Sequence, residues 1–396
     1  MKILLAAASF ASKMSGLQRH ALNVARCLLL APEVSTLHLV FAPWQHHFVQ
    51  EAGFRSDPRL VTHIATINKS SLSRNLWYYR DLPELANRLG VDLVHFSYPM
   101  PVNGGAFNCP TLVTLHDMYP YEIPMNFGFP KFIFNRIILS QCLRNIDAVA
   151  CVSDTTLLRL REYTPPSVWQ KALRIHNCVE AEPSGVIETP IRGWRGERFL
   201  LSVAQHRRNK NIPLLIQSFH RLLRNGQIPA DVKLLVIGIA GPETERIRRL
   251  VSSLGLGGSA SFHEGVSESE LKWCYAQCEA VVCPSLTEGF GLPIAEALLA
   301  GCRVVCSDIP AFREVGDGQC HFVALDGNAE AALAAAIVAT LNEPKGTQKA
   351  LRQFSAPVLA KQYTSVYRRL ISSPNRSSNA RVAASINAAA SERLPL

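Results

Sequence analysis

Two glutamates around a glycine-rich loop are the residues whose types and spacing point most directly to chemistry. Glu288 stands in the loop, and Glu296 stands in the apolar segment that follows it. This segment is typical of a helix, because Pro293 lies near its start and Gly301 lies just past its end. Short apolar runs on both sides are typical of buried strands. The sequence therefore predicts a strand, a loop, a helix and another strand in succession.

The start of this helix is suited to an anion, because its first amides are unpaired and the helix dipole is positive there. Carboxylates are poor ligands for phosphate but good acceptors for the hydroxyl groups of a sugar. Glu288 and Glu296 are too far apart in the sequence to be neighbours on one helix. We therefore expect them to contact different parts of one ligand, which predicts a nucleotide-sugar site.

A basic loop precedes another expected helix and carries Arg207, Arg208 and Lys210. A lysine can meet a diphosphate as a point charge, and an arginine can meet it with two parallel hydrogen bonds. The alternative is an ordinary solvated basic turn. The glycine-rich loop elsewhere in the same half of the chain favours the diphosphate.

Two residues of the first half of the chain are also placed where strands end. His116 follows the apolar run 111–115, and Gly16 lies in the loop after the first expected strand. Ligands of open parallel sheets gather at the carboxyl ends of the strands. We therefore expect both residues at the site, where a side chain at position 16 would keep a phosphate away. The alternatives are a core or capping histidine and a simple turn glycine.

Alternating strands and helices must position these residues, and they predict an α/β fold with parallel sheets covered on both faces. Strands are expected at residues 2–8, 36–42, 61–65, 91–97, 111–115, 148–152, 173–177, 199–204, 232–237, 260–264, 280–283 and 303–306. Helices are expected at residues 17–30, 75–89, 131–145, 154–163, 212–224, 243–254, 268–278 and 355–371.

The length of 396 residues and a break in the pattern predict two domains. We expect an N-terminal Rossmann-like domain at 1–180, a proline- and glycine-rich linker at 181–196 and a C-terminal Rossmann-like domain at 197–355. A helix at 356–372 follows, and a disordered tail is expected at 373–396 because it has few large apolar residues.

The composition excludes several classes of protein. Hydrophobic residues make up 48% and charged residues 18%, as in globular proteins. The net charge of +10 would suit nucleic acid, anionic lipid or phosphorylated substrates, or it reflects only a basic tail. Eleven cysteines without a C-x-x-C pair predict reduced thiols in the cytoplasm. We expect the apolar N-terminus to be a strand rather than a signal peptide, and no stretch is long enough to cross a membrane.

Missing motifs narrow the function further. The chain has no G-x-G-x-x-G after its first strand and no G-x-x-x-x-G-K-[ST], which argues against a dinucleotide oxidoreductase and a P-loop nucleotidase. It has no D-x-D carboxylate pair for Mg²⁺ or Mn²⁺. We therefore expect neither a metal nor a cofactor. The aromatic and basic stretch 119–136 is either a surface for the acceptor or a membrane, or ordinary core packing.

Taken together, these motifs resemble the GT4 family of retaining glycosyltransferases, also called glycosyl transferases group 1, which have the GT-B fold. The resemblance covers residues 2–371, and its most specific part is the family's E-x7-E motif from Glu288 to Glu296. The other matching segments are Ser15-Gly16, Thr114-Leu-His-Asp117, Val152-Ser153, Ile175-His-Asn-Cys-Val179, Lys210-Asn211, Phe354-Ser355 and Tyr367-Arg368. The resemblance implies two Rossmann-like domains that face each other across a cleft, with the last helix crossing back to the N-terminal domain.

The resemblance also implies a role for each site residue. Glu288 would hold hydroxyls of the donor sugar, Glu296 the ribose, and Lys210 the diphosphate. The loop residues implied in donor binding are Gly289, Phe290, Gly291 and Leu292. Gly16 would let the N-terminal domain approach the phosphates, and His116 would contact the donor sugar near the reacting carbon.

Two positions depart from the pattern of the family. Its second N-terminal glycine is Ser15 here, and the arginine often found before the lysine is Gln205. Arg207 or Arg208 would take the place of that arginine.

The expected function is therefore metal-independent, retaining transfer of a hexose from a nucleotide-diphosphate sugar. The resemblance favours GDP-mannose as donor and a saccharide or lipid-linked acceptor of a bacterial-type cell-surface polysaccharide or lipopolysaccharide. It also favours a cytoplasmic enzyme with peripheral contact at the inner face of the cell membrane. The alternatives are a synthase of a soluble disaccharide or glycoconjugate and a catalytically silent GT-B scaffold subunit. A nucleic-acid binder would explain only the charge.

Overall fold

The computed structural model describes residues 1–51, 54, 57–180, 189–316, 318–344 and 351–373. Its contacts divide the chain into two compact units, each built around one sheet. The expected tail at 374–396 and residues 181–188 of the expected linker lie outside the described residues. Both sheets are parallel throughout their described strand pairs, so the predicted α/β class of two Rossmann-like domains is confirmed.

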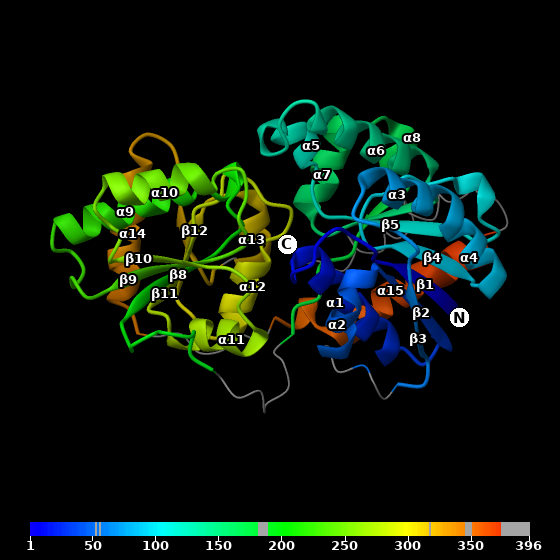
Figure 1. Cartoon of the computed structure of the whole chain (residues 1–396), viewed down its shortest axis with the longest axis horizontal. Helices are drawn as coiled ribbons and strands as arrows, with labels where there is room; N and C mark the ends of the chain where they lie inside the picture. Colours follow the sequence, from blue (N-terminus) through cyan, green and yellow to red (C-terminus); the bar gives the residue numbers. More distant parts are fainter. Residues whose placement is uncertain (52–53, 55–56, 181–188, 317, 345–350, 374–396) are drawn as a thin grey trace. The chain divides into compact units, whose positions relative to one another are not determined.

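The sheet of the first unit has seven described strands in the order β3-β2-β1-β4-β5-β6-β7. These strands are β1 (Lys2–Ala6), β2 (Thr36–Phe41), β3 (Leu60–Ile64), β4 (Leu93–Phe96), β5 (Thr111–Leu115), β6 (Ala148–Cys151) and β7 (Ala172–Arg174). Helices cover both faces of this sheet (Figure 1). They are α1 (Gly16–Leu30), α2 (His46–Glu51), α3 (Ser71–Leu76), α4 (Leu82–Leu89), α5 (Tyr119–Glu122), α6 (Lys131–Asn145), α7 (Asp154–Tyr163), α8 (Pro166–Trp169) and α15 (Ala356–Ser372).

The expected helix over 75–89 is interrupted. A π-helical turn, Trp77–Asp81, separates α3 from α4, and the amide of Leu82 donates to the carbonyl of Trp77. Pro83 explains the interruption, because proline has no N–H and its ring crowds the carbonyl one turn earlier. The apolar spacing alone could not show this change of hydrogen bonding.

The core of the first unit lies on both faces of its sheet because side chains alternate along each strand. On β1, Ile3 and Leu5 belong to one buried cluster, and Leu4 and Ala6 belong to the other. The last helix, α15, packs against α1 and contributes to the first cluster. It therefore belongs to the first unit, although it follows the second unit in the sequence.

The sheet of the second unit has six described strands in the order β10-β9-β8-β11-β12-β13. These strands are β8 (Phe199–Val203), β9 (Lys233–Ile237), β10 (Ala260–His263), β11 (Ala280–Cys283), β12 (Val304–Ser307) and β13 (His321–Val323). The helices are α9 (Ile212–Arg224), α10 (Thr244–Ser253), α11 (Glu268–Gln277), α12 (Leu292–Leu299), α13 (Pro310–Gly316) and α14 (Ala329–Leu341).

A short segment from the first half of the chain also belongs to the second unit. Ile123–Gly128 lies between α5 and α6 in the sequence, within the expected N-terminal domain, yet it packs with the second unit. The buried Asn126 explains the placement: its side chain donates to Asn209 over 3.0 Å and accepts the amide of Arg208 over 3.1 Å.

The strand order reverses once in each sheet, between β1 and β4 in the first unit and between β8 and β11 in the second. Ligands of open α/β sheets bind outside the carboxyl ends of the strands at this reversal. The loops after these four strands are therefore the places at which a site is expected on topology alone.

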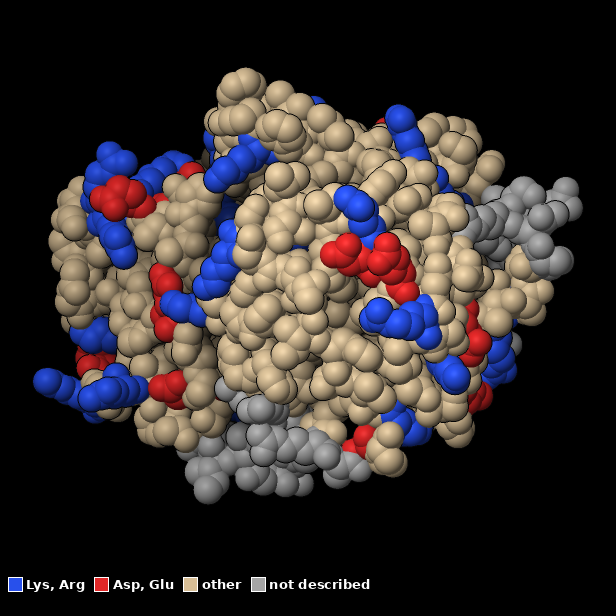
Figure 2. Space-filling model, turned by 45° about the vertical axis from the view of Figure 1, so that its right-hand side comes forward, with Lys and Arg blue, Asp and Glu red and all other residues tan. Residues whose placement is uncertain are grey.

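The helices and the charged surface bear on two predictions from the sequence, that no stretch crosses a membrane and that the chain carries a net positive charge. Within the described residues, no helix is long and apolar enough to cross a membrane. On the face drawn in Figure 2, lysines and arginines form separate groups with acidic residues among them.

Candidate functional site

The two loops at the reversal of the second sheet are joined by an ion pair between predicted site residues. Lys210 follows β8 and Glu288 follows β11, and Nζ of the lysine lies 2.6 Å from Oε1 of the glutamate. The hydroxyl of Ser285 donates to the same oxygen over 2.7 Å. Both charged side chains are largely buried, with 18% and 9% of their surfaces exposed. Because an unpaired charge in such a place is costly, the pair keeps both groups compensated.

Asn209 fastens the same two loops through its main chain and side chain. It is fully buried, and its carbonyl accepts the amide of Leu286 over 2.7 Å. Its side-chain amide donates to the carbonyl of Thr287 over 3.3 Å. The loop that carries the lysine and the loop that carries the glutamate are thus held in one position by neutral hydrogen bonds as well as by charge.

Gly291 is the last residue of the glycine-rich loop and directly precedes α12. Its φ is +112°, a conformation that favours glycine, and a Cβ atom there would lie 2.9 Å from the ring of Phe312. Phe290 is buried beside it, and Pro293 lies in the first turn of the helix. The predicted residues from Gly289 to Leu292 therefore lead directly from Glu288 into the start of α12.

Glu296 lies within α12 and has a different neighbour from Glu288. The hydroxyl of Tyr275, on α11, donates to its Oε2 over 2.8 Å. Sequence reasoning missed Tyr275, because its place among the apolar residues of a helix gives no sign of this contact. The structure keeps the two glutamates in separate surroundings, as their spacing suggested.

The two arginines of the basic loop differ in exposure. Arg207 is half-buried and Arg208 is exposed. Within the described chain, neither guanidinium forms an ion pair with a carboxylate. Both arginines therefore remain candidates for the residue that replaces the family arginine at Gln205.

In the first unit, His116 immediately follows β5 and is fixed by the loop after β4. Its Nε2–H donates to the carbonyl of Ser97 over 2.8 Å, which leaves Nδ1 as the unprotonated ring nitrogen. Part of the ring surface is open, yet protein surrounds it closely enough that desolvation lowers the pKa of His116 to about 4. The ring is therefore neutral near pH 7 and can accept a hydrogen bond through Nδ1.

A second histidine, His20 of α1, packs edge-on against His116 with ring centroids 4.5 Å apart. Its Nδ1 lies 2.8 Å from the side-chain oxygen of Asn177, and its Nε2 lies 3.3 Å from the hydroxyl of Thr114. Burial, with smaller contributions from His116 and His95, holds the pKa of His20 well below its ordinary value.

The hydrogen bonds continue from Thr114 to the last helix. Nε2 of His95 lies 2.8 Å from the hydroxyl of Thr114, and its Nδ1 lies 2.6 Å from the hydroxyl of Tyr367. We call Asn177, His20, Thr114, His95 and Tyr367 the buried polar chain. Sequence reasoning missed His20 and His95, because a histidine among apolar residues does not show its partners. Asn177, Thr114 and Tyr367 did lie in segments that resemble the family.

Gly16 is the first residue of α1, after the loop that follows β1. A Cβ atom at this position would meet no heavy atom within 4 Å, and its φ is not in the left-handed region. The hydroxyl of Ser15 donates to the side chain of Gln18. Neither packing nor backbone conformation requires a glycine at position 16, so the fold itself does not explain the residue.

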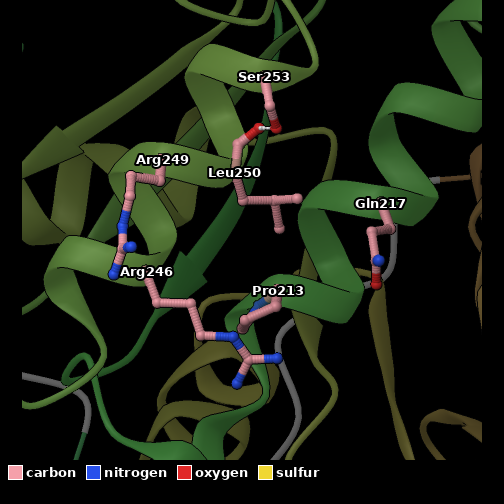
Figure 3. A pocket seen from close by; sticks show the side chains of 6 residues that line it. All are labelled: Pro213, Gln217, Arg246, Arg249, Leu250 and Ser253. Atoms are coloured by element: carbon pink, nitrogen blue, oxygen red, sulfur yellow. Dashed lines mark hydrogen bonds between the residues drawn. The ribbon is translucent and has the colours of Figure 1, made fainter.

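Other places among the described residues give weaker support for a binding site. No group of three or more histidine, cysteine, aspartate or glutamate side chains among them could hold a metal ion. A hollow of about 390 Å³ lies between α9 and α10, lined in part by Pro213, Arg246 and Arg249 (Figure 3). Arg246 is paired with Glu243 over 2.9 Å, and none of the predicted site residues lines the hollow.

The fold is that of the GT-B glycosyltransferases. The structure is similar to HepE from Anabaena, solved in complex with UDP and glucose, with a TM-score of 0.61 and 16% sequence identity over 98% of this chain and 100% of that one. This likeness shows the arrangement of the chain within each sheet and its helices. It defines the class of protein.

Sequence comparison identifies the family. The model of glycosyl transferases group 1 matches residues 190–355, and the model of glycosyltransferase family 4 matches residues 14–182. The chain belongs to this GT4-type family and is a glycosyltransferase.

Two curated relatives are mannosyltransferases. The O-antigen chain mannosyltransferase RfbU of Salmonella typhimurium is 27% identical over 65% of this chain and 68% of its own length. The O-antigen chain mannosyltransferase B of Escherichia coli is 24% identical over 87% of this chain and 91% of its own length.

Proposed function

We propose that this glycosyltransferase moves mannose, with retention of configuration, from GDP-mannose to a saccharide or lipid-linked acceptor in the synthesis of a bacterial cell-surface polysaccharide. The observation that supports it most is the pair of Lys210 and Glu288 beside the start of α12, at the strand reversal of the second sheet. A cation for phosphate and a carboxylate for sugar hydroxyls stand side by side there.

The same pair suggests how the donor is received. A diphosphate that approaches Lys210 competes with Glu288 for the ammonium group. The glutamate is then released to accept hydrogen bonds from sugar hydroxyls, and Ser285 keeps it oriented. The positive end of the α12 dipole and an arginine of the basic loop add positive potential at the diphosphate.

Electrostatic stabilisation of the leaving group is the proposed source of the rate. Cleavage of the bond between sugar and phosphate builds negative charge on the diphosphate, which preorganised cations and amides stabilise. The predicted site residues include no obvious enzyme nucleophile, so we propose front-face transfer in which the leaving diphosphate takes the proton of the acceptor. His116 would orient the donor sugar as a neutral hydrogen-bond acceptor.

Transfer without a metal ion is a further part of the proposal. Lys210, the basic loop and the helix start would stabilise the negative charge of the diphosphate in place of a divalent cation. Transfer measured with excess EDTA tests this directly: unchanged rates are expected, and a loss that Mg²⁺ or Mn²⁺ restores would contradict it.

The named relatives support mannose as the sugar and a polysaccharide as the product. A polysaccharide of the cell surface is assembled on a membrane, so we place the enzyme in the cytoplasm at the inner face of that membrane. A catalytically silent scaffold would have no use for a buried pair of opposite charges beside a helix start.

Incubation with GDP-mannose and a membrane extract containing lipid-linked acceptors tests the function. Mass spectrometry should show acceptors heavier by one hexose with the wild-type protein. Glu288→Ala and His116→Ala should lose most of this transfer. Equal transfer by wild type and both variants would contradict the catalytic assignment.

A further inference from the structure

Helix α6 of the first unit carries an apolar surface that the described protein leaves open. Phe129, Ile133, Phe134 and Ile137 are exposed by 82%, 39%, 60% and 58% of their surfaces. We call these four residues the α6 apolar face. Ile133 and Phe134 lie four and three residues before Ile137, so these three lie on one side of α6, and Phe129 lies in the residues that lead into the helix. Large side chains gathered in this way mark an interaction site.

The charged residues of α6 itself are all basic. Residues 131–145 contain Lys131, Arg136 and Arg144 and no acidic residue. Within the described residues, none of these three side chains pairs with a carboxylate. Arg136 is held over the rings of Tyr121 and Phe132, at 5.0 and 5.4 Å, so its charge is kept at a fixed place beside the apolar side chains.

A hollow of about 450 Å³ adjoins the α6 apolar face. Ile137 forms part of its wall, together with Arg136 and Arg144. The remaining wall is polar and comes from Ser140, Gln141 and Asn145, with Tyr121 at its edge. Nε and Nη2 of Arg136 donate to the carbonyls of Pro120 and Tyr121 over 2.7 and 3.4 Å, which leaves its Nη1. An anionic headgroup fits such a wall through this Nη1 and the guanidinium of Arg144, because guanidinium groups donate hydrogen bonds to phosphate oxygens.

We infer that α6 is the surface through which the enzyme docks on an anionic lipid bilayer. The α6 apolar face enters the boundary between headgroups and acyl chains, and Lys131, Arg136 and Arg144 contact the phosphates. A helix with bulky apolar residues on one side and only basic charges binds membranes in this manner. The inference names the membrane contact of the proposed function, but it depends on the surface and not on the donor.

Vesicle sedimentation tests the docking surface. At about 0.1 M salt, the full chain should bind vesicles of 30 mol% phosphatidylglycerol in phosphatidylcholine, and bind pure phosphatidylcholine far more weakly. Phe134→Gln/Ile137→Gln should lower the partition coefficient at least about tenfold, because two large apolar side chains are removed. Lys131→Gln/Arg144→Gln should lower it about tenfold on the anionic vesicles alone.

Leu30→Gln provides the matched control. Leu30 is exposed by 57%, as Ile137 is by 58%, but it lies at the end of α1. Leu30→Gln should bind vesicles as the wild type does, while Ile137→Gln alone should bind more weakly. Thermal shifts caused by GDP should be equal in all variants, so that a failure of docking is distinguished from a failure of the donor site.

Three results would overturn the inference. The first is wild-type protein that does not sediment with the anionic vesicles, and the second is a Leu30→Gln variant that loses as much binding as Ile137→Gln. The third is unchanged vesicle binding by Phe134→Gln/Ile137→Gln with a shift from dimer to monomer in light scattering, which would make the α6 apolar face an interface between copies of this chain.

Discussion

The two sheets have the same strand order around their reversals, but the polar residues that follow their strands differ in charge. At the strand reversal of the second unit, Lys210 and Glu288 face each other as full charges. Around the reversal of the first unit, His20 and His95 are buried and His116 is partly buried, all three rings are neutral, and hydrogen bonds fix them. The topology supplies the place for a site, and the residues after the strands decide its chemistry.

The difference suggests a division of work. Mobile negative charge, such as a leaving diphosphate, requires opposite charge nearby, and the second unit supplies it. A sugar carries no charge, so neutral groups with fixed directions are enough to orient it. The first unit has such groups, which it keeps in place through the buried polar chain. The predictions that follow remove one side of this comparison at a time.

The largest effect is expected when the cation of the second unit is removed. Lys210→Ala should lower kcat/KM for transfer from GDP-mannose by about 10²- to 10³-fold, the size found for the loss of one electrostatic group. Steady-state kinetics with excess EDTA measure it. Lys233→Ala is the control, because Lys233 begins β9 and therefore lies at the amino ends of the parallel strands, whereas Lys210 follows the carboxyl end of β8. Equal losses in both variants would contradict a special role for Lys210.

Removal of the neutral group of the first unit should have the next largest effect. His116→Ala should lower kcat by about 10- to 100-fold, because the hydrogen bond that orients the sugar is lost. GDP binding, measured by calorimetry, should stay within about twofold of wild type, since the phosphates are held elsewhere. Weaker GDP binding with unchanged kcat would reverse the assigned roles.

Gly16 separates a ligand effect from a folding effect. Gly16→Ala should leave the melting temperature unchanged or slightly raised, because the new methyl group meets nothing and the residue is helical. Transfer should nevertheless fall by about tenfold if a phosphate approaches this backbone. Gly105→Ala, also without neighbours within 4 Å, should change neither quantity. Normal transfer by Gly16→Ala would remove this residue from the site.

The neutral histidines also predict a dependence of stability on pH. Burial lowers the pKa of His95 to about 3 and that of His116 to about 4, whereas both titrate near 6.5 in the unfolded chain. Below pH 6.5 the unfolded state therefore binds more protons than the folded state. Each histidine should remove roughly 1.4 kcal/mol of stability per pH unit as the pH falls from 6.5 to its folded pKa.

Thermal melts between pH 7 and pH 5 measure this loss, which should be absent above pH 7 and grow on acidification. His95→Gln should show a shallower dependence than wild type. A melting temperature that does not fall between pH 6.5 and pH 5 would show that these rings are not held neutral by burial.

The smallest effect concerns the link between the buried polar chain and the last helix. Tyr367→Phe removes the hydroxyl that lies 2.6 Å from Nδ1 of His95 and leaves this buried ring nitrogen without its hydrogen-bond partner. The cost should be about 1 to 3 kcal/mol, seen as a drop of a few degrees in the melting temperature. Tyr79→Phe, at a side chain exposed by 41%, serves for comparison and should change the melting temperature little. If the rate of transfer fell by more than the lower stability explains, Tyr367 would be assigned to catalysis.

Much of the fold could be predicted because the strands are continuous apolar runs. Helices 131–145 and 212–224 have the same bounds in the structure as in the prediction, since charges and glycine or proline mark their ends. The bonding of Leu82 to Trp77 could not be predicted, because it depends on which carbonyl Pro83 leaves unpaired. The placement of Ile123–Gly128 depends on contacts of Asn126 with residues more than eighty positions away.

The sequence predicted those parts of the candidate site that depend on residues close together in the chain. Glu288 and Lys210 were found because each ends a strand within a recognisable loop, and the structure brings them together. Their pairing, the hydrogen bond of Tyr275 to Glu296, and the contact of His20 with His116 join distant parts of the sequence. The roles of these residues toward a donor stay predictions.

The most direct test of the account is binding of nucleotide diphosphates to the wild type and to Lys210→Ala. Thermal shift with GDP, UDP and ADP should show stabilisation of the wild type, largest with GDP, because a ligand of the folded state raises its melting temperature. Lys210→Ala should lose most of the shift, and Lys233→Ala should keep it. No shift with any of the three nucleotides, or an equal shift in Lys210→Ala, would contradict the assignment of the second unit as the donor site.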